Sequence, residues 1–144
     1  EQPLIPHSFR KAAHDMKVPA VVYEGGESLR LDKYAIQGGL LFIKNILNAM
    51  KMTAAEKTLF AEEQWVIHKD NWVRAVSPGI FIRLKKSGEI VSKGDKLGEI
   101  KDPYGTKSID VICGYTGHII GHNNASVVSL GDALFHVGYE YSKV

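Results

Sequence analysis

The stretch Ile90-Val-Ser-Lys-Gly-Asp-Lys-Leu-Gly-Glu-Ile100 has a counterpart later in the chain, Ser126-Val-Val-Ser-Leu-Gly-Asp-Ala-Leu-Phe-His-Val137. Both stretches place a Gly-Asp pair between β-forming residues, and both follow an earlier glycine, Gly79 or Gly117, at nearly the same spacing. A Gly-Asp pair is typical of a tight turn, because glycine tolerates positive φ and aspartate bonds the nearby backbone. The two stretches therefore indicate an internal repeat.

Each half of this repeat is predicted to run strand, Gly turn, strand, loop, Gly-Asp turn and strand. One half is too small to bury its own apolar face, so we expect the two halves to interlock into one flattened barrel. The arrangement resembles the biotinyl/lipoyl-like barrel-sandwich hybrid. Upstream of it, residues 64–69 and 72–76 are predicted to be strands on either side of a turn at Asp70-Asn71. The composition changes near residues 60–64, which predicts two domains, 1–62 and 63–144.

A biotin or lipoyl carrier function is not favoured. Such carriers present a modifiable lysine, usually beside methionine, on the hairpin between the two halves. Here the connector Lys101-Asp-Pro-Tyr-Gly-Thr-Lys-Ser108 contains lysine but no methionine. The tripeptide Met50-Lys51-Met52 lies before the barrel, at the end of a predicted helix, where no exposed turn would present it.

The first part of the chain carries helix signals. Residues 8–17 are predicted to form a short helix with Ser8 as N-cap. A longer amphipathic helix is expected after Asp32, a good N-cap, and Gly38-Gly39 in its middle costs about 1 kcal/mol per glycine relative to alanine. Such glycines indicate close packing against a neighbour. Thr53-Ala-Ala-Glu56 is a capping box that predicts another short helix.

Between the first two helices lies Pro19-Ala-Val-Val-Tyr-Glu-Gly-Gly-Glu-Ser28. Its unbroken apolar run is typical of a strand buried on both faces, and the two glycines end it. We therefore expect Glu24 at the carboxyl end of a buried strand, the edge of an α/β sheet at which ligands bind. The alternative is a strand cap with a solvated carboxylate.

Composition excludes several classes of function. The net charge is +2, from 18 basic and 16 acidic residues, which is too balanced to indicate a nucleic-acid or membrane-surface partner. No stretch approaches the ~18 apolar residues of a membrane span, and no signal peptide is visible. The single Cys113 is expected to be a small buried hydrophobe and fits a reducing compartment, so we predict a cytoplasmic location.

Other chemistry-bearing patterns are weak. His118 and His122 are four residues apart, but Gly117 and Gly121 beside them argue against the helix that such a metal-binding pair needs. No Gly-x-Ser-x-Gly occurs, and Cys113 has no base placed near it in the sequence. We predict no metal site within this chain.

The chain resembles the C-terminal part of the succinylglutamate desuccinylase/aspartoacylase family. The resemblance rests on Phe9-Arg10, Val18-Pro19-Ala20, Tyr23-Glu24-Gly25-Gly26-Glu27, the long helix and the Ser-Pro-Gly-Ile-Phe barrel at 77–81, and it covers essentially the whole chain. These proteins are zinc-dependent deacylases with a carboxypeptidase-like catalytic domain and an appended β domain.

The resemblance implies roles for three residues. By motif, Glu24 is the general acid/base that activates water on the zinc ion. Arg10, the only arginine upstream of Glu24, takes the place of the arginine that binds the substrate carboxylate. Tyr104, in the connector turn of the β domain, contributes to the entrance of the substrate site. The family's zinc ligands precede this glutamate, and no residue here matches them.

The fold expected from these observations is α/β + β: the terminal strand-helix part of a carboxypeptidase-like domain (1–62), then a biotinyl/lipoyl-like barrel (63–144). The expected function is zinc-dependent hydrolysis of the amide bond of an N-acyl amino acid, with this chain inactive alone as a C-terminal fragment. The alternative is a non-catalytic binding or assembly module built on the barrel. We further expect a homo-oligomer, because an α/β unit lacking most of its sheet leaves apolar edges that another copy would cover.

Overall fold

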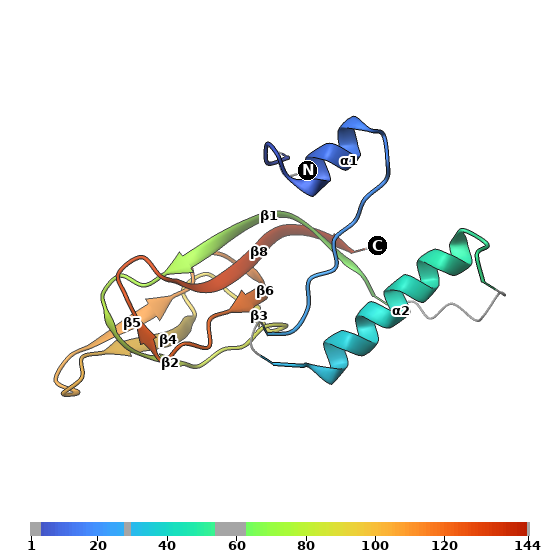
Figure 1. Cartoon of the computed structure of the whole chain (residues 1–144). Coiled ribbons are helices and arrows are strands. Elements are labelled where there is room, and N and C mark those ends of the chain that lie inside the picture. Colours follow the sequence, from blue (N-terminus) through green and yellow to red (C-terminus); the bar gives the residue numbers. More distant parts are fainter. Residues whose placement is uncertain (1–3, 28–29, 54–62, 144) are drawn as a thin grey trace. The chain divides into compact units, whose positions relative to one another are not determined.

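The computed structural model describes residues 4–27, 30–53 and 63–143 of the 144-residue chain. The chain divides into two compact units, Glu1–Glu62 and Glu63–Val144. Figure 1 shows that the first unit carries the two helices and the second carries the strands. Capping hydrogen bonds stabilise the helices of the first unit, and antiparallel strand pairing stabilises the second unit.

The helices of the first unit begin where the sequence predicted. Helix α1 (Phe9–Asp15) is capped by Ser8, whose side chain accepts a hydrogen bond from the backbone N–H of Lys11. Helix α2 (Lys33–Ala49) is capped by Asp32, whose carboxylate accepts from the N–H groups of Tyr34 and Ala35. These bonds satisfy N–H groups that a helix start otherwise leaves unpaired. The short helix predicted from the capping box Thr53–Glu56 falls on residues 54–62, outside the described part of the chain.

The buried strand predicted within Pro19–Ser28 is not formed over residues 19–27, the described part of that stretch. Residues 19–27 are assigned to no strand and all are exposed, with Val21 at 66% and Val22 at 53% relative accessibility. A strand needs a neighbour to satisfy its backbone groups, and the described residues of this unit contain only α1 and α2. Glu24 therefore follows an extended, solvent-facing segment and not the end of a sheet strand.

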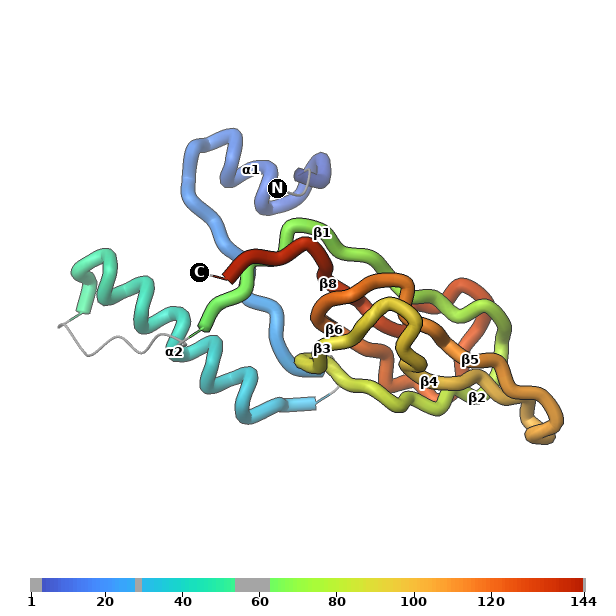
Figure 2. Tube along the Cα trace, turned by 180° about the vertical axis from the view of Figure 1, so that it is seen from behind, coloured from blue at the N-terminus to red at the C-terminus, as the bar shows by residue number. Residues whose placement is uncertain are grey.

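The second unit contains eight strands in two antiparallel sheets. The strands are β1 (Trp65–Arg74), β2 (Gly79–Arg83), β3 (Ile90–Val91), β4 (Lys96–Lys101), β5 (Ser108–Ile112), β6 (Gly117–His122), β7 (Val127–Val128) and β8 (Ala133–Lys143). One sheet has the order β1-β8-β6-β3 and the other β5-β4-β2-β7. Figures 1 and 2 show these layers from opposite sides, with the β4–β5 hairpin extending beyond them.

The internal repeat predicted from the sequence is present, and each of its halves contributes one short strand to the sheet of the other half. Strand β3 of the first half pairs with β6 of the second, with Val91 opposite Gly117. Strand β7 of the second half pairs with β2 of the first, with Val128 opposite Gly79. The two sheets are equivalent under the repeat. If each strand of one half is exchanged with its counterpart in the other half (β1 with β5, β2 with β6, β3 with β7 and β4 with β8), the first sheet order becomes the second. Among residues 63–143 the two sheets remain separate ladders, so the closed barrel expected from the sequence is not formed.

The first Gly-Asp turn is bonded to the start of the second half. The N–H of Gly94 donates to the carbonyl of Cys113 at 2.8 Å, and the N–H of Cys113 donates to the carbonyl of Asp95 at 2.8 Å. The Asp95 carboxylate accepts the N–H of Ser92 at 2.9 Å, which closes the turn. Cys113 is buried and unbonded to another cysteine, which confirms it as a small core residue.

The second Gly-Asp turn repeats these bonds on the first half. The N–H of Gly131 donates to the carbonyl of Ala75, and the N–H of Ala75 donates to the carbonyl of Asp132, both at 2.8 Å. The Asp132 carboxylate accepts the N–H of Ser129 at 2.7 Å. The two matching sequence stretches therefore form equivalent turns, and each turn is hydrogen-bonded to the backbone of the opposite half.

The predicted turn at Asp70-Asn71 is wrong, because both residues lie inside the continuous strand β1. They pair with Gly138 and Val137 of β8. The Asp70 carboxylate lies 2.8 Å from Nε2 of His136, and the Asn71 amide donates to the hydroxyl of Tyr115 at 2.6 Å. Polar partners within the same unit thus replace the local turn bonds that these residue types usually make.

The core of the second unit lies between its two sheets. Phe81 of β2 and Phe135 of β8, which belong to different sheets, meet edge to face with ring centroids 5.9 Å apart. The buried cluster comprises Ala75, Phe81, Val91, Leu97, Ile100, Val111, Cys113, Ile119, Val128, Leu134, Phe135 and Val137. In the described part of the chain, no helix is long and apolar enough to span a membrane.

Alanine at Gly94 or Gly131 is expected to lower the free energy of unfolding by about 1 kcal/mol each, because L residues are strained at positive φ. The φ angles are +97° and +88°, and an added Cβ would meet nothing within 4 Å at either position, so the cost comes from the backbone alone. Gly114 is the matched control, since its surroundings are equally open and its φ is not in that region. Gly114→Ala should be neutral or slightly stabilising in urea denaturation; an equal loss at all three positions would contradict the turn assignment.

Candidate functional site

The residues on both sides of Glu24 contact helix α2 or its N-cap. On its N-terminal side, the hydroxyl of Tyr23 donates a 2.7 Å hydrogen bond to the carbonyl of Ala35 in α2. The Tyr23 ring also stacks on Phe42, with centroids 5.9 Å apart and planes 25° apart. The segment that carries Glu24 is therefore attached to one face of the long helix, although it forms no sheet strand.

On the C-terminal side, Gly26 approaches the start of α2 closely. Its φ is +81°, and a Cβ at this position would lie 3.1 Å from Cβ of Asp32 and 3.2 Å from Cβ of Ala35. Neither the backbone conformation nor the space suits a side chain. A shallow hollow between this turn and α2 is lined by Tyr23, Gly25, Gly26, Arg30, Asp32 and Gly39, among others. Glu24 is next to this hollow in sequence and does not line it.

The Glu24 carboxylate has no partner among the residues that the structure describes. Within residues 4–27, 30–53 and 63–143, every other Asp and Glu side chain makes a hydrogen bond or an ion pair, whereas Glu24 makes neither. Glu27 in the same turn, for example, pairs with Arg30 at 3.7 Å. An unpaired carboxylate keeps its lone pairs available to a substrate or an attacking water.

The close neighbour that Gly38-Gly39 predicted is Tyr23. A Cβ at Gly38 would lie 2.8 Å from the Tyr23 hydroxyl, and one at Gly39 would lie 3.1 Å from its Cε1 atom. The sequence analysis missed Tyr23 itself. The available signal was an aromatic residue directly before a Gly-Gly turn that leads into a helix with two central glycines.

Arg10 is not brought to Glu24. It is exposed in α1, and among the described residues its side chain makes no hydrogen bond or ion pair with the Glu24 carboxylate. Its helix is fixed by the Ser8 cap and by the Lys11–Asp15 ion pair at 2.5 Å. A guanidinium without a partner among the described residues is chemically suited to a ligand carboxylate.

Tyr104 lies at the exposed tip of the β4–β5 hairpin, with 89% of its surface accessible. The turn below it is closed by Asp102, whose carboxylate accepts the N–H of Lys107 at 2.7 Å and the hydroxyl of Thr106 at 2.9 Å. The carbonyl of Asp102 accepts the N–H of Gly105 at 3.0 Å. The hydrogen bond from the Lys107 backbone is the main cause that lowers the pKa of the Asp102 carboxyl below its ordinary value of 3.8. The tip is thus an ordered turn that presents an aromatic side chain.

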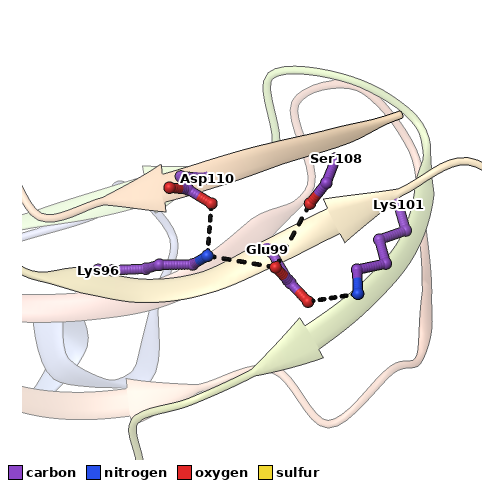
Figure 3. A network of polar contacts seen from close by, with 5 residues as sticks. All are labelled: Lys96, Glu99, Lys101, Ser108 and Asp110. Carbon is purple, nitrogen blue, oxygen red and sulfur yellow. Dashed lines mark hydrogen bonds and ion pairs between the residues drawn. The ribbon is translucent and has the colours of Figure 1, made fainter. Parts of the chain in front are cut away.

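A network of charged side chains joins the strands at the base of this hairpin (Figure 3). Lys96 contacts Asp110 at 2.6 Å and Glu99 at 3.2 Å, and Lys101 contacts Glu99 at 2.8 Å. Lys101 and then Lys96 lower the pKa of Glu99, while Asp110 and then Glu99 raise the pKa of Lys96. Two cations and two anions neutralise one another here, so the network ties β4 to β5 and offers no net charge to a ligand.

The described residues do not form a zinc site. No group of three His, Cys, Asp or Glu side chains in the described part of the chain could hold a metal ion. The ring of His118 packs against Trp65 and Tyr141, with centroids 5.1 and 4.6 Å away. Nδ1 of His122 instead accepts the N–H of Ser87 at 3.0 Å. Neither histidine is therefore part of a cluster of three metal ligands among the described residues.

No protein-family profile matches the sequence, and no curated protein matches it. Solved structures do match the fold. The product-bound ectoine utilization protein EutE (DoeB) from Ruegeria pomeroyi has a TM-score of 0.80 and 20% identity, over 90% of this chain and 41% of that chain. A succinylglutamate desuccinylase from Silicibacter sp. TM1040 has a TM-score of 0.81 and 16% identity, over 90% of this chain and 40% of that chain.

A third match is a succinylglutamate desuccinylase/aspartoacylase from Rhodobacter sphaeroides, with a TM-score of 0.65 and 21% identity over 78% of this chain and 37% of that chain. The chain thus spans about two fifths of the length of the structures it matches. The resemblance predicted from the sequence is confirmed as a resemblance of fold: this mixed α/β chain matches the C-terminal part of such proteins.

The Asp102 turn gives a prediction about pH. Because the pKa of Asp102 is lower in the folded hairpin, its contribution is present above the ordinary value of 3.8 and is lost as the pH falls through the folded pKa, below 3.8. In NMR spectra recorded on acidification, the amide resonance of Lys107 should titrate with a midpoint below 3.8. Asp102→Asn should abolish this titration; a Lys107 amide that titrates in the variant as before would contradict the assignment.

Proposed function

We propose that this chain is the C-terminal part of a zinc-dependent hydrolase that cleaves the amide bond of an N-acyl amino acid. The observation that supports this most is the fold match over 90% of the chain to proteins described as a succinylglutamate desuccinylase and an ectoine utilization protein. The motif Tyr23-Glu24-Gly25-Gly26 adds a carboxylate that is unpaired among the described residues, on a backbone attached to α2.

In this proposal Glu24 acts as the general acid/base. Its carboxylate accepts a proton from the water that adds to the amide carbonyl, and it then donates this proton to the nitrogen of the departing amine. The C–N bond breaks, and the products are a carboxylate and a free amino acid. Zinc, when bound, would supply Lewis-acid chemistry, and in this proposal its ligands come from the part of the full-length protein that precedes Glu24, because the described residues offer no group of three metal ligands.

The other predicted residues keep supporting roles in the proposal. Every N-acyl amino acid carries a carboxylate, and the guanidinium of Arg10 can bind such a group through two parallel hydrogen bonds. Tyr104 projects from an ordered hairpin tip, as expected for a residue that narrows a substrate entrance. We also assign the paired sheets of residues 63–143 to the barrel-sandwich class, because their halves exchange β3 and β7. Homo-oligomer formation and a cytoplasmic location stay predictions.

The catalytic role of Glu24 is tested in the full-length protein loaded with zinc. Glu24→Gln is expected to lower kcat for N-succinylglutamate and for N-acylated aspartate by about 10²-fold or more, the usual contribution of a general acid/base. Glu27→Gln is the matched control, because Glu27 lies in the same turn but pairs with Arg30. Full activity of Glu24→Gln would exclude the proposed role and leave a binding or assembly module as the function of this part.

The 144-residue chain alone is expected to show no amide hydrolysis even with added zinc, because its described residues offer no cluster of three metal ligands. The same substrates and the full-length protein provide the comparison. Hydrolysis by the short chain that Glu24→Gln abolishes would show a metal site within this chain and contradict this expectation.

A further inference from the structure

We propose that Tyr23 is a positioning residue for Glu24, acting through its contact with Gly38 and Gly39 of α2. The inference rests on the proposed function, because it assigns Tyr23 a role relative to a catalytic carboxylate. Tyr23 itself is not required to touch the substrate. It fixes where the backbone of Glu24 stands with respect to the long helix.

The first support is that Tyr23 and Glu24 are adjacent and that only Tyr23 is bonded to the helix. Its hydroxyl donates to the carbonyl of Ala35 at 2.7 Å, and its ring stacks on Phe42. The Glu24 side chain is exposed and unpaired among the described residues, so its own contacts do not determine its position. The neighbouring Tyr23 contacts are therefore what constrain it.

The second support is the glycine pair. Each glycine inside a helix costs about 1 kcal/mol relative to alanine, so two in succession require a reason. Apart from the adjacent residues and the helix's own backbone, the nearest described atoms to a Cβ built on Gly38 or on Gly39 belong to Tyr23. The helix surface is thus left without side chains where the Tyr23 ring and hydroxyl lie.

The third support is that the chain is held on the other side of Glu24 as well. A Cβ at Gly25 would lie 2.9 Å from the Tyr23 hydroxyl, and one at Gly26 would lie 3.1 Å from Cβ of Asp32. Glu24 and Gly25 therefore lie between two segments, at Tyr23 and at Gly26, that both pack on α2 or its N-cap. A shift of either segment moves the carboxylate, and proton transfer is sensitive to displacements of about 1 Å.

The geometry allows a suppressor test in the full-length, zinc-loaded protein with N-succinylglutamate as substrate. Gly38→Ala places a Cβ 2.8 Å from the Tyr23 hydroxyl but 3.7 Å from Cζ, which is ordinary contact. We expect Gly38→Ala to lower kcat about tenfold or more with KM nearly unchanged, because the reacting geometry is disturbed. Tyr23→Phe removes the clashing oxygen, so Tyr23→Phe/Gly38→Ala should recover the kcat of Tyr23→Phe alone.

Gly39 provides the internal control. A Cβ there meets the ring atoms Cε1 at 3.1 Å and Cδ1 at 3.4 Å, which phenylalanine retains. Tyr23→Phe should therefore not rescue Gly39→Ala. Tyr34→Phe on the same helix and Gly114→Ala, in open space, are matched substitutions that should leave kcat and KM unchanged.

The outcomes separate the two proposals. If Glu24→Gln loses activity while Gly38→Ala keeps its kcat, or while Tyr23→Phe fails to recover Gly38→Ala, the positioning role is overturned and the proposed function stands. Thermal unfolding of the same variants shows whether each is folded. If Glu24→Gln is fully active, the proposed function fails, and the positioning role fails with it.

Discussion

The second unit depends on backbone pairing between its two halves. Strand β3 finds its partner only in the other half, as does β7, and each Gly-Asp turn exchanges two backbone hydrogen bonds with the opposite half. Because these contacts join segments distant in sequence, neither half has a complete sheet alone, and the fold is expected to form cooperatively. The hairpin that carries Tyr104 connects the two halves. Both of its strands, β4 and β5, are therefore fixed by the sheet from which the tip projects.

The first unit depends on local contacts instead. In its described residues only Ala13 is a buried hydrophobic residue, and α2 has no buried residue. Its apolar side chains, such as Val21, Ile36 and Leu40, remain exposed. The helices begin at capped positions, and the segment before Glu24 is ordered through Tyr23 and two glycines. The described residues of this unit are therefore ordered by a few local contacts and not by a buried core.

The sequence predicted features whose cause is local or repeated along the chain. Ser8 and Asp32 cap their helices because each lies directly before helix-forming residues, and the matched Gly-Asp pairs form matched turns. Features that depend on distant partners were predicted poorly. Asp70-Asn71 has turn chemistry, but His136 and Tyr115 satisfy these side chains inside a strand. The apolar run before Glu24 has strand chemistry, yet the described residues offer it no neighbouring strand.

The candidate site depends both on a local sequence pattern and on contacts that only the structure reveals. Sequence pattern alone could place Glu24 before two glycines, but it could not show that the carboxylate has no partner among the described residues. Elsewhere in that part of the chain, carboxylates cap a helix, close a turn or pair with lysine, as Asp32, Asp102 and Glu99 do. Each of those groups is explained by the structure it stabilises. Glu24 has no such role among the described residues, while a Cβ added at Gly38 would lie only 2.8 Å from the hydroxyl of its neighbour Tyr23. The contacts of Tyr23 with α2, and the lack of a partner for the Glu24 carboxylate among the described residues, are the two observations that support the proposed acid/base role over a solvated strand cap.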